Sequence, residues 1–188
     1  DRPLRTAINE VRPIAVDTLI TYALERAKAE GHDIDTEQGS GFEPVVRRCL
    51  IEKMDDPSTA VHCVFGKRLR NLYWIDRSLV EDHIDIIFPM DDDAESRDRF
   101  SAAWAAFLRV SPWVEELYED LQDQYLHAVD LHATEDRFNG HSAGNKFIAH
   151  ALFPYLDADE PLTAEDSFLP YFYANTTPDK AKSAAWQL

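Results

Sequence analysis

The side chains of this sequence best suited to metal binding or acid–base chemistry are its histidines. They are His32, His62, His83, His127, His132, His141 and His150. A metal site needs at least three convergent ligands, and His127, Asp130 and His132 come nearest to such a set. Side chains two residues apart on a helix point about 200° away from each other, so these three cannot converge, and we predict no metal ligands. His83 and His150 fall near apolar helix faces, where we expect hydrogen-bonded residues at the edge of the core.

The acidic run from Asp91 to Asp93, with Glu95, offers oxygen ligands of the kind that Ca²⁺ and Mg²⁺ prefer. The spacing of an EF-hand fails here, because the glycine at the sixth loop position and the glutamate at the twelfth are both missing. A helix N-terminus also attracts acidic side chains, through its free N–H groups and its dipole. We therefore interpret the run as the cap of the helix that follows.

No sequence motif indicates a catalytic or cofactor-binding site. The phosphate-binding patterns GxxxxGK[ST] and GxGxxG do not occur, and Gly39-Ser40-Gly41 is too short and is followed by Phe42-Glu43, which offers no cation. The zinc motif HExxH and the nucleophile motif GxSxG are absent as well. We predict no catalytic residues and no cofactor.

Composition limits the classes of partner. The chain has 188 residues and a formal net charge of −16, from 35 acidic and 19 basic residues. Nucleic-acid phosphates and anionic lipids are bound through basic clusters, so neither is expected as a partner. A protein partner is expected instead, and a basic one would be steered by the acidic surface.

Cysteine content and hydropathy favour a cytoplasmic protein. Cys49 and Cys63 are the only cysteines, too few to staple a chain of this length, and each falls on an apolar helix face. No run of about 18 apolar residues occurs, so we expect no membrane span. The chain starts without Met and its last helix stops at the apolar Leu188 without a capping residue, which suggests a fragment of a longer array.

Apolar residues recur with helical spacing along most of the chain, and about eight to nine helices are expected. They cover approximately residues 4–30, 44–54, 57–74, 77–88, 94–108, 112–129 and 142–156, with an eighth around 168–173 and a ninth after Pro178. Short loops and the lack of strand-like alternation predict an all-α fold. We expect one domain over residues 1–188, an antiparallel stack of helical pairs of the HEAT/TPR-like solenoid type.

The first of these helices carries one apolar stripe and an internal proline. The stripe comprises Ile8, Val11, Ala15, Leu19, Tyr22 and Ala27. Pro13 should either kink this helix or mark the first turn of a new helix that begins after Val11-Arg12. Gly31 is expected to end it.

Three further helix starts and one core stripe are predicted from capping patterns. Asp56 is expected as an N-cap with Pro57 at the first helical position, Asp76 as the next N-cap, and Ser111 as an N-cap followed by Pro112. Between them, a complete core-facing stripe is expected from Phe100, Ala103, Trp104, Phe107 and Leu108.

Several of these segments together resemble a known kind of helical array. They are Asp56-Pro57 with Val61, Phe65 to Leu69, Leu72 to Asp76, Phe88-Pro89 and Trp104 to Leu108. This succession is similar to the C-terminal HEAT-like or TPR-like arrays of large bacterial NTPase-type and sirtuin-like proteins, many associated with antiphage defence. Ala7 to Ala15 resembles the helix opening A-x-N-x-V-R-G-x-A of these arrays, although Pro13 stands where glycine is expected. The resemblance implies a non-catalytic module whose catalytic domain lies elsewhere in the parent protein.

The function expected from the sequence is therefore a protein-interaction, sensor or scaffold module of a larger cytoplasmic bacterial protein. The resemblance implies a role of that protein in antiphage defence. Aromatic residues on a concave solenoid surface commonly anchor partners, and the candidates here are Phe168, Tyr171 and Tyr173. Two alternatives stay open: a metal-assisted hydrolase built on a helical bundle, and an acidic mimic of nucleic acid. The oligomeric state is open as well.

Overall fold

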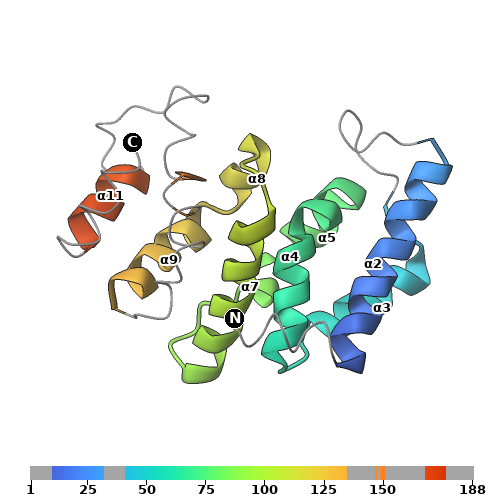
Figure 1. Ribbon diagram of the computed structural model, residues 1–188, viewed down its shortest axis with the longest axis horizontal. Helices are drawn as coiled ribbons and strands as arrows, with labels where there is room; N and C mark the ends of the chain where they lie inside the picture. Colours follow the sequence, from blue (N-terminus) through green and yellow to red (C-terminus); the bar gives the residue numbers. More distant parts are fainter. Residues whose placement is uncertain (1–9, 32–40, 135–146, 148, 151–167, 177–188) are drawn as a thin grey trace. The chain divides into compact units, whose positions relative to one another are not determined.

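The computed structural model describes residues 10–31, 41–134, 147, 149–150 and 168–176 (Figure 1). These residues form nine helices and no strand, which confirms the predicted all-α class. The helices are α2 (Val11–Ala29), α3 (Pro44–Met54), α4 (Thr59–Ile75), α5 (Arg77–Glu81), α6 (Ile84–Ile87), α7 (Ala94–Val110), α8 (Glu115–Asp120), α9 (Gln122–Thr134) and α11 (Phe168–Asn175).

The chain divides into two compact units, Asp1–Ser111 and Pro112–Leu188. The expected single domain over residues 1–188 stays a prediction. The expected helix over residues 142–156 is described only at residues 147 and 149–150, which are helical. The expected ninth helix, after Pro178, lies outside the described residues.

In the first unit, α4 is the central helix and lies between α2 and α7 (Figure 1). Most of its residues are buried, on every side of the helix. Its contact with α7 is closest at Gly66, where an added Cβ would overlap the backbone carbonyl of Ala103. Glycine at this position therefore lets the two backbones approach.

The core stripe predicted on α7 is confirmed. Phe100, Ala103, Trp104, Phe107 and Leu108 are all buried. The ring of Phe88, which follows α6, packs edge-on against Trp104, with 5.5 Å between the ring centroids, and is fully buried as well. Aromatic residues therefore hold the α6–α7 connection against α7.

Two of the predicted N-caps are confirmed. Asp76 precedes α5, and its carboxylate accepts a hydrogen bond of 3.0 Å from the backbone N–H of Leu79. Asp93 precedes α7, and its carboxylate accepts from the N–H groups of Glu95 and Ser96, both at 2.9 Å. The acidic run before α7 thus contains a helix cap, as its position predicted.

The other two predicted N-caps are wrong. Helix α4 begins after Ser58, and Asp56 instead turns its carboxylate to the N–H of Ser58 and to the Arg12 guanidinium, each 3.0 Å away. Ser111 is the C-cap of α7, and Val114 precedes α8. An Asp-Pro or Ser-Pro pair does not by itself show whether it precedes or follows a helix. For Asp56, the competing contact is with Arg12, which is 44 residues away in sequence and so is not visible in the local pattern.

The remaining boundaries also differ from the expected ones. The helix predicted over residues 77–88 is two short helices, α5 and α6, because the backbone leaves the helical conformation at His83. The helix predicted over 112–129 is likewise divided, at Leu121, into α8 and α9. Helix α2 begins at Val11, so Pro13 lies in its first turn, one of the two expected outcomes. Gly31, with φ +91°, follows the end of α2 as predicted.

In the second unit, Tyr125 of α9 is the centre of an aromatic core. Its ring lies 5.6 Å from that of Phe168 and 6.3 Å from that of Phe147, measured between centroids. A hydrogen bond of 2.7 Å joins its hydroxyl to His150 Nδ1. Burial raises the pKa of Tyr125 well above its usual value of 10. The phenol therefore stays protonated, as a hydrogen-bonded part of the core.

Candidate functional site

The three aromatic residues expected to form a partner surface lie on α11 but in different environments. Phe168 is buried against Tyr125 and Phe147. The Tyr171 hydroxyl donates a hydrogen bond of 2.9 Å to the Asp130 carboxylate on α9. Tyr173 is 40% exposed. Of the three, Tyr173 alone offers a large exposed side chain to a partner.

The histidines and acidic residues weighed for metal binding are engaged in local contacts. Asp130 accepts the hydrogen bond from Tyr171, and the Asp92 carboxylate pairs with Arg97 at 2.6 Å. Burial lowers the pKa of His127, and the side chain of His132 lies outside the described residues. Across the part of the chain that the structure describes, no group of three or more His, Cys, Asp or Glu side chains could hold a metal ion.

His83 and His150 are hydrogen-bonded as predicted, His83 at the edge of the core and His150 within it. His62 was given no role by its sequence context. Its side chain is fully buried on α4. Its Nδ1 lies 3.2 Å from the Ile87 carbonyl oxygen and its Nε2 lies 3.1 Å from that of Asp56. Since a neutral imidazole has one N–H, it can donate to only one of these two acceptors. Burial lowers the pKa of His62.

Helix α2 is apolar on two opposite faces. One face is buried in the first unit through Pro13, Val16, Ile20, Leu24 and Ala27. The opposite face exposes what we call the outer stripe, namely Val11, Ile14, Ala15, Thr18 and Tyr22. Val11 is 83% exposed, Ile14 44% and Tyr22 52%. Such large apolar exposure on one helix face is unusual and commonly marks an interaction site.

The sequence stripe assigned to the first helix is thus corrected. Val11, Ala15 and Tyr22 share one face, which is exposed, whereas Ala27, assigned to the same stripe, is buried on the opposite face. Periodicity shows which residues share a helix face, and it cannot tell which of two apolar faces packs against the rest of the protein. The signal that could have revealed the outer stripe is the presence of apolar residues at spacings that suit both faces.

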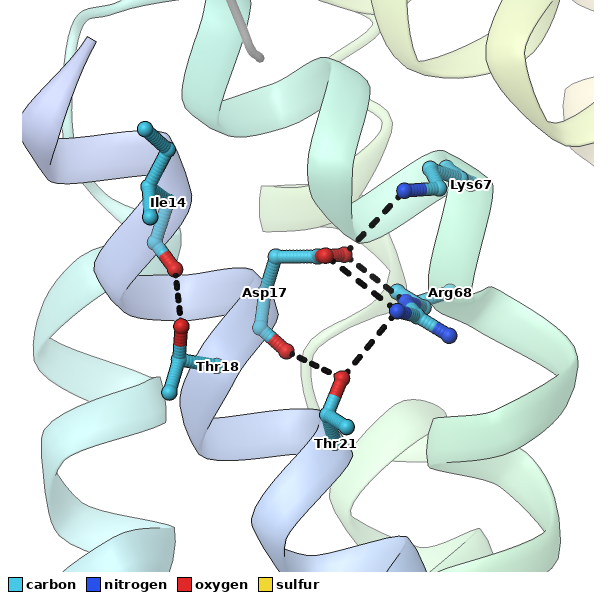
Figure 2. A network of polar contacts seen from close by, with 6 residues as sticks. All are labelled: Ile14, Asp17, Thr18, Thr21, Lys67 and Arg68. Carbon is cyan, nitrogen blue, oxygen red and sulfur yellow. Dashed lines mark hydrogen bonds and ion pairs between the residues drawn. The ribbon is translucent and has the colours of Figure 1, made fainter. Parts of the chain in front are cut away.

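Thr18 contributes to the apolar character of the outer stripe despite its hydroxyl. That hydroxyl donates a hydrogen bond of 2.7 Å to the Ile14 carbonyl oxygen of the same helix (Figure 2). A threonine that bonds back to its own helix needs no outside acceptor. A partner that covers Thr18 would therefore leave no donor unsatisfied.

A polar network fixes α2 against α4. The Asp17 carboxylate accepts hydrogen bonds from Arg68 at 2.8 and 3.2 Å and from Lys67 at 3.3 Å, and Arg68 also donates to the Thr21 hydroxyl at 3.1 Å (Figure 2). Burial alone would raise the pKa of Asp17, but the hydrogen bonds and charges of Arg68 and Lys67 outweigh it and lower the pKa below 3.8. The outer stripe is thus presented by a helix that is anchored on its other side.

Charged side chains beside the outer stripe are neutralised within the chain. Arg12 pairs with Asp56 at 3.0 Å, and Lys28 pairs with Glu25 at 2.9 Å. Arg26 pairs with Glu30 at 2.8 Å and also contacts Glu43 of the loop before α3. The three basic and four acidic side chains on the flanks of the outer stripe nearly cancel, so a partner gains little by bringing a charge of either sign to them.

The acidity of the chain is concentrated away from α2 in the sequence. Residues 77–134 contain 14 acidic and four basic residues, whereas α2 contains two acidic and three basic ones. Residues 110–134, which include α8 and α9, contain six acidic residues and no Lys or Arg. The outer stripe and the acidic segment thus differ in chemistry.

Among the described residues, none of the helices is both long and apolar enough for a transmembrane span. No protein-family model matches the chain, and no curated protein or solved structure matches it significantly.

Proposed function

We propose that this chain is a non-catalytic protein-interaction or scaffold module of a larger cytoplasmic bacterial protein, and that it binds its partner through the outer stripe of α2. The observation that carries the proposal is the second apolar face of α2, which the first unit does not use for its own core. Exposed apolar area on an anchored helix favours binding, because a helix that is already ordered loses little conformational entropy when a partner binds.

A helical-repeat architecture is the wider setting of this proposal. In HEAT-like and TPR-like arrays each helical layer contacts its neighbours, and a layer presents an apolar face wherever a further layer packs against it. The succession α2, α4, α7 in the first unit and the outward face of α2 are compatible with such a stack. We include in the same proposal a parent protein of the antiphage defence class, to whose arrays the sequence bears a resemblance.

The proposal is tested by affinity capture with matched variants of the chain as bait. Val11→Glu and Tyr22→Glu each place a charge on the outer stripe. Val45→Glu is the control, because Val45 is 60% exposed on α3 and lies outside the stripe. We expect a protein retained by the parent and by Val45→Glu to be lost from both stripe variants. Equal retention by all four chains would show that the outer stripe is not the binding surface.

A second candidate function, the acidic mimic of nucleic acid, is favoured by the segment 110–134 alone. Its six acidic residues without a Lys or Arg could present a negative surface to a DNA-binding protein. Such binding weakens steeply as salt concentration rises, because it depends on charge. Apolar binding through α2 changes little or strengthens under the same conditions, so capture at two salt concentrations separates the two functions.

A further inference from the structure

We infer that the partner of the outer stripe is a second copy of this chain, and that the two α2 helices pair in antiparallel orientation about a twofold axis. This inference rests on the proposed interaction function and names its partner. It follows from the spacing of the exposed residues, from the charges beside them and from the sizes of the side chains that such a pair brings together.

The outer stripe has the spacing of a coiled-coil seam. Val11, Ala15, Thr18 and Tyr22 are separated by four, three and four residues. These intervals average about 3.7 residues, close to the 3.6 residues of a helical turn, so the four side chains form a nearly straight seam that can face a second helix along its length. Ile14 widens the seam on one side. The exposed residues of α2 are therefore arranged for a helix partner rather than for a loop or a small molecule.

The charges beside the seam favour an identical partner over a charged one. The flanking ions pair within the chain, through Arg12 with Asp56, Lys28 with Glu25, and Arg26 with Glu30 and Glu43. Three basic and four acidic side chains take part in these pairs, so a basic or acidic partner would meet nearly compensated charge on this face. Two copies of the same face meet as neutral, apolar surfaces, and a twofold interface requires a surface that is complementary to itself.

One antiparallel register makes the seam complementary to itself. With the twofold axis between residues 16 and 17, Val11 of each copy lies opposite Tyr22 of the other. In the same register Ala15 lies opposite Thr18, so a small residue meets a medium one at the centre. Glu25, the next residue at seam spacing, then falls outside the paired region. Every layer of the pair is uncharged.

The net charge of the chain gives self-association a characteristic dependence on salt. Two chains of formal charge −16 repel each other at low ionic strength, and salt screens this repulsion without weakening apolar contact. Self-association through the outer stripe should therefore strengthen as salt rises. Binding of a basic partner to the acidic segment would show the opposite trend.

Analytical ultracentrifugation of the full 188-residue chain tests the inference. We expect a monomer–dimer equilibrium whose dissociation constant falls between 50 mM and 500 mM NaCl. Val11→Glu and Tyr22→Glu should each raise that constant by at least about tenfold, since each dimer would bury two uncompensated charges. Val45→Glu adds the same charge outside the stripe and should leave most of the association intact. Circular dichroism checks that the variants are folded, as we expect because all three positions are exposed.

A mixing experiment tests the orientation of the pair. Val11→Lys and Tyr22→Glu are each expected to be monomeric alone. Mixed, they should form a heterodimer, because in the antiparallel register Lys at position 11 of one chain meets Glu at position 22 of the other. A parallel pair would place like positions together, and mixing would restore nothing.

The outcomes separate this inference from the function on which it rests. A chain that stays monomeric at both salt concentrations, or a dimer unaffected by both stripe substitutions, overturns the inference. If the chain is monomeric but the stripe variants still lose a captured protein of a different sequence, the proposed function stands and only the identity of the partner is wrong. If neither association nor capture responds to the stripe, both are wrong.

Discussion

At the scale of single residues, His62 carries the clearest chemical consequence. Its buried ring lies between the carbonyl oxygens of Asp56 and Ile87, so it joins the segment before α4 to the end of α6. Burial lowers its pKa, and the positive charge of Arg99 acts in the same direction, while the two carbonyl contacts and the Asp56 charge act against it. The net result favours a neutral ring in the folded protein.

This ring should make the folded protein sensitive to mild acid. A histidine whose pKa is lower in the folded state than its unfolded value of 6.5 binds its proton preferentially in the unfolded state. The free energy of unfolding should be at its full value above pH 6.5 and fall below it, by up to about 1.4 kcal/mol per pH unit for one such group.

Urea unfolding at pH 7.5 and pH 5.5 measures this loss. His62→Gln, which can still donate one hydrogen bond but cannot titrate, should show a smaller loss than the parent. His127→Gln is the matched comparison, because burial lowers the pKa of His127 too and it lies in the other unit. An unchanged pH dependence in His62→Gln would contradict the neutral, buried ring.

At the scale of elements, the α4–α7 contact depends on the missing side chain at Gly66. A Cβ there would meet the carbonyl, carbonyl carbon and Cα of Ala103, all backbone atoms that cannot rotate away. The two helices would have to separate, and the aromatic packing of Trp104 and Phe107 beside the contact would loosen with them. The polar anchor between Asp17 and Arg68 fixes the other side of α4.

Gly66→Ala should therefore destabilise the first unit, although alanine is the better helix former. Overpacking of a close contact costs about 1–3 kcal/mol, which exceeds the gain in helix propensity of about 1 kcal/mol. Denaturant unfolding followed by tryptophan fluorescence measures the change. Gly31→Ala is the comparison: it adds the same methyl group in open space and strains only the backbone at φ +91°. A Gly66→Ala variant at least as stable as the parent would show that α4 and α7 lie farther apart.

At the scale of the whole molecule, the charge of the chain is unevenly distributed along the sequence. Residues 77–134 hold 14 acidic residues against four basic ones, whereas α2 and α4 together hold two acidic residues against six basic ones. Repulsion among the acidic residues opposes folding at low ionic strength. Surface ion pairs contribute little in compensation, on the order of 0–1 kcal/mol each.

Salt should consequently stabilise the folded chain. We expect the thermal midpoint of unfolding to rise between 10 mM and 300 mM NaCl. Salt weakens both the repulsion among the acidic residues and the attraction within the ion pairs, and the repulsion is the larger of the two. Measurements at two protein concentrations separate this effect from self-association, which adds stability only at the higher one. A midpoint that falls with salt would mean that the ion pairs outweigh the acidic repulsion.

The positions of most helices, two of their N-caps and the core-facing stripe of α7 could be predicted from the sequence, because these features depend on local spacing. The stripe of Phe100, Trp104 and Phe107 and the caps Asp76 and Asp93 are confirmed, since each involves residues within a few positions of one another. Proline and glycine likewise marked the start and the end of α2.

What depended on tertiary structure was the direction in which each apolar face points. Val11 and Tyr22 were placed correctly on one face, yet only the packing of α2 onto α4 through the opposite face left them exposed. Asp56 does not cap α4 as predicted, and its carboxylate instead accepts a charge-assisted hydrogen bond from Arg12, which is distant in sequence. Local spacing thus determined the helices of this protein. Contacts between distant residues decided which helix faces remain exposed, because burial depends on which neighbours reach each face.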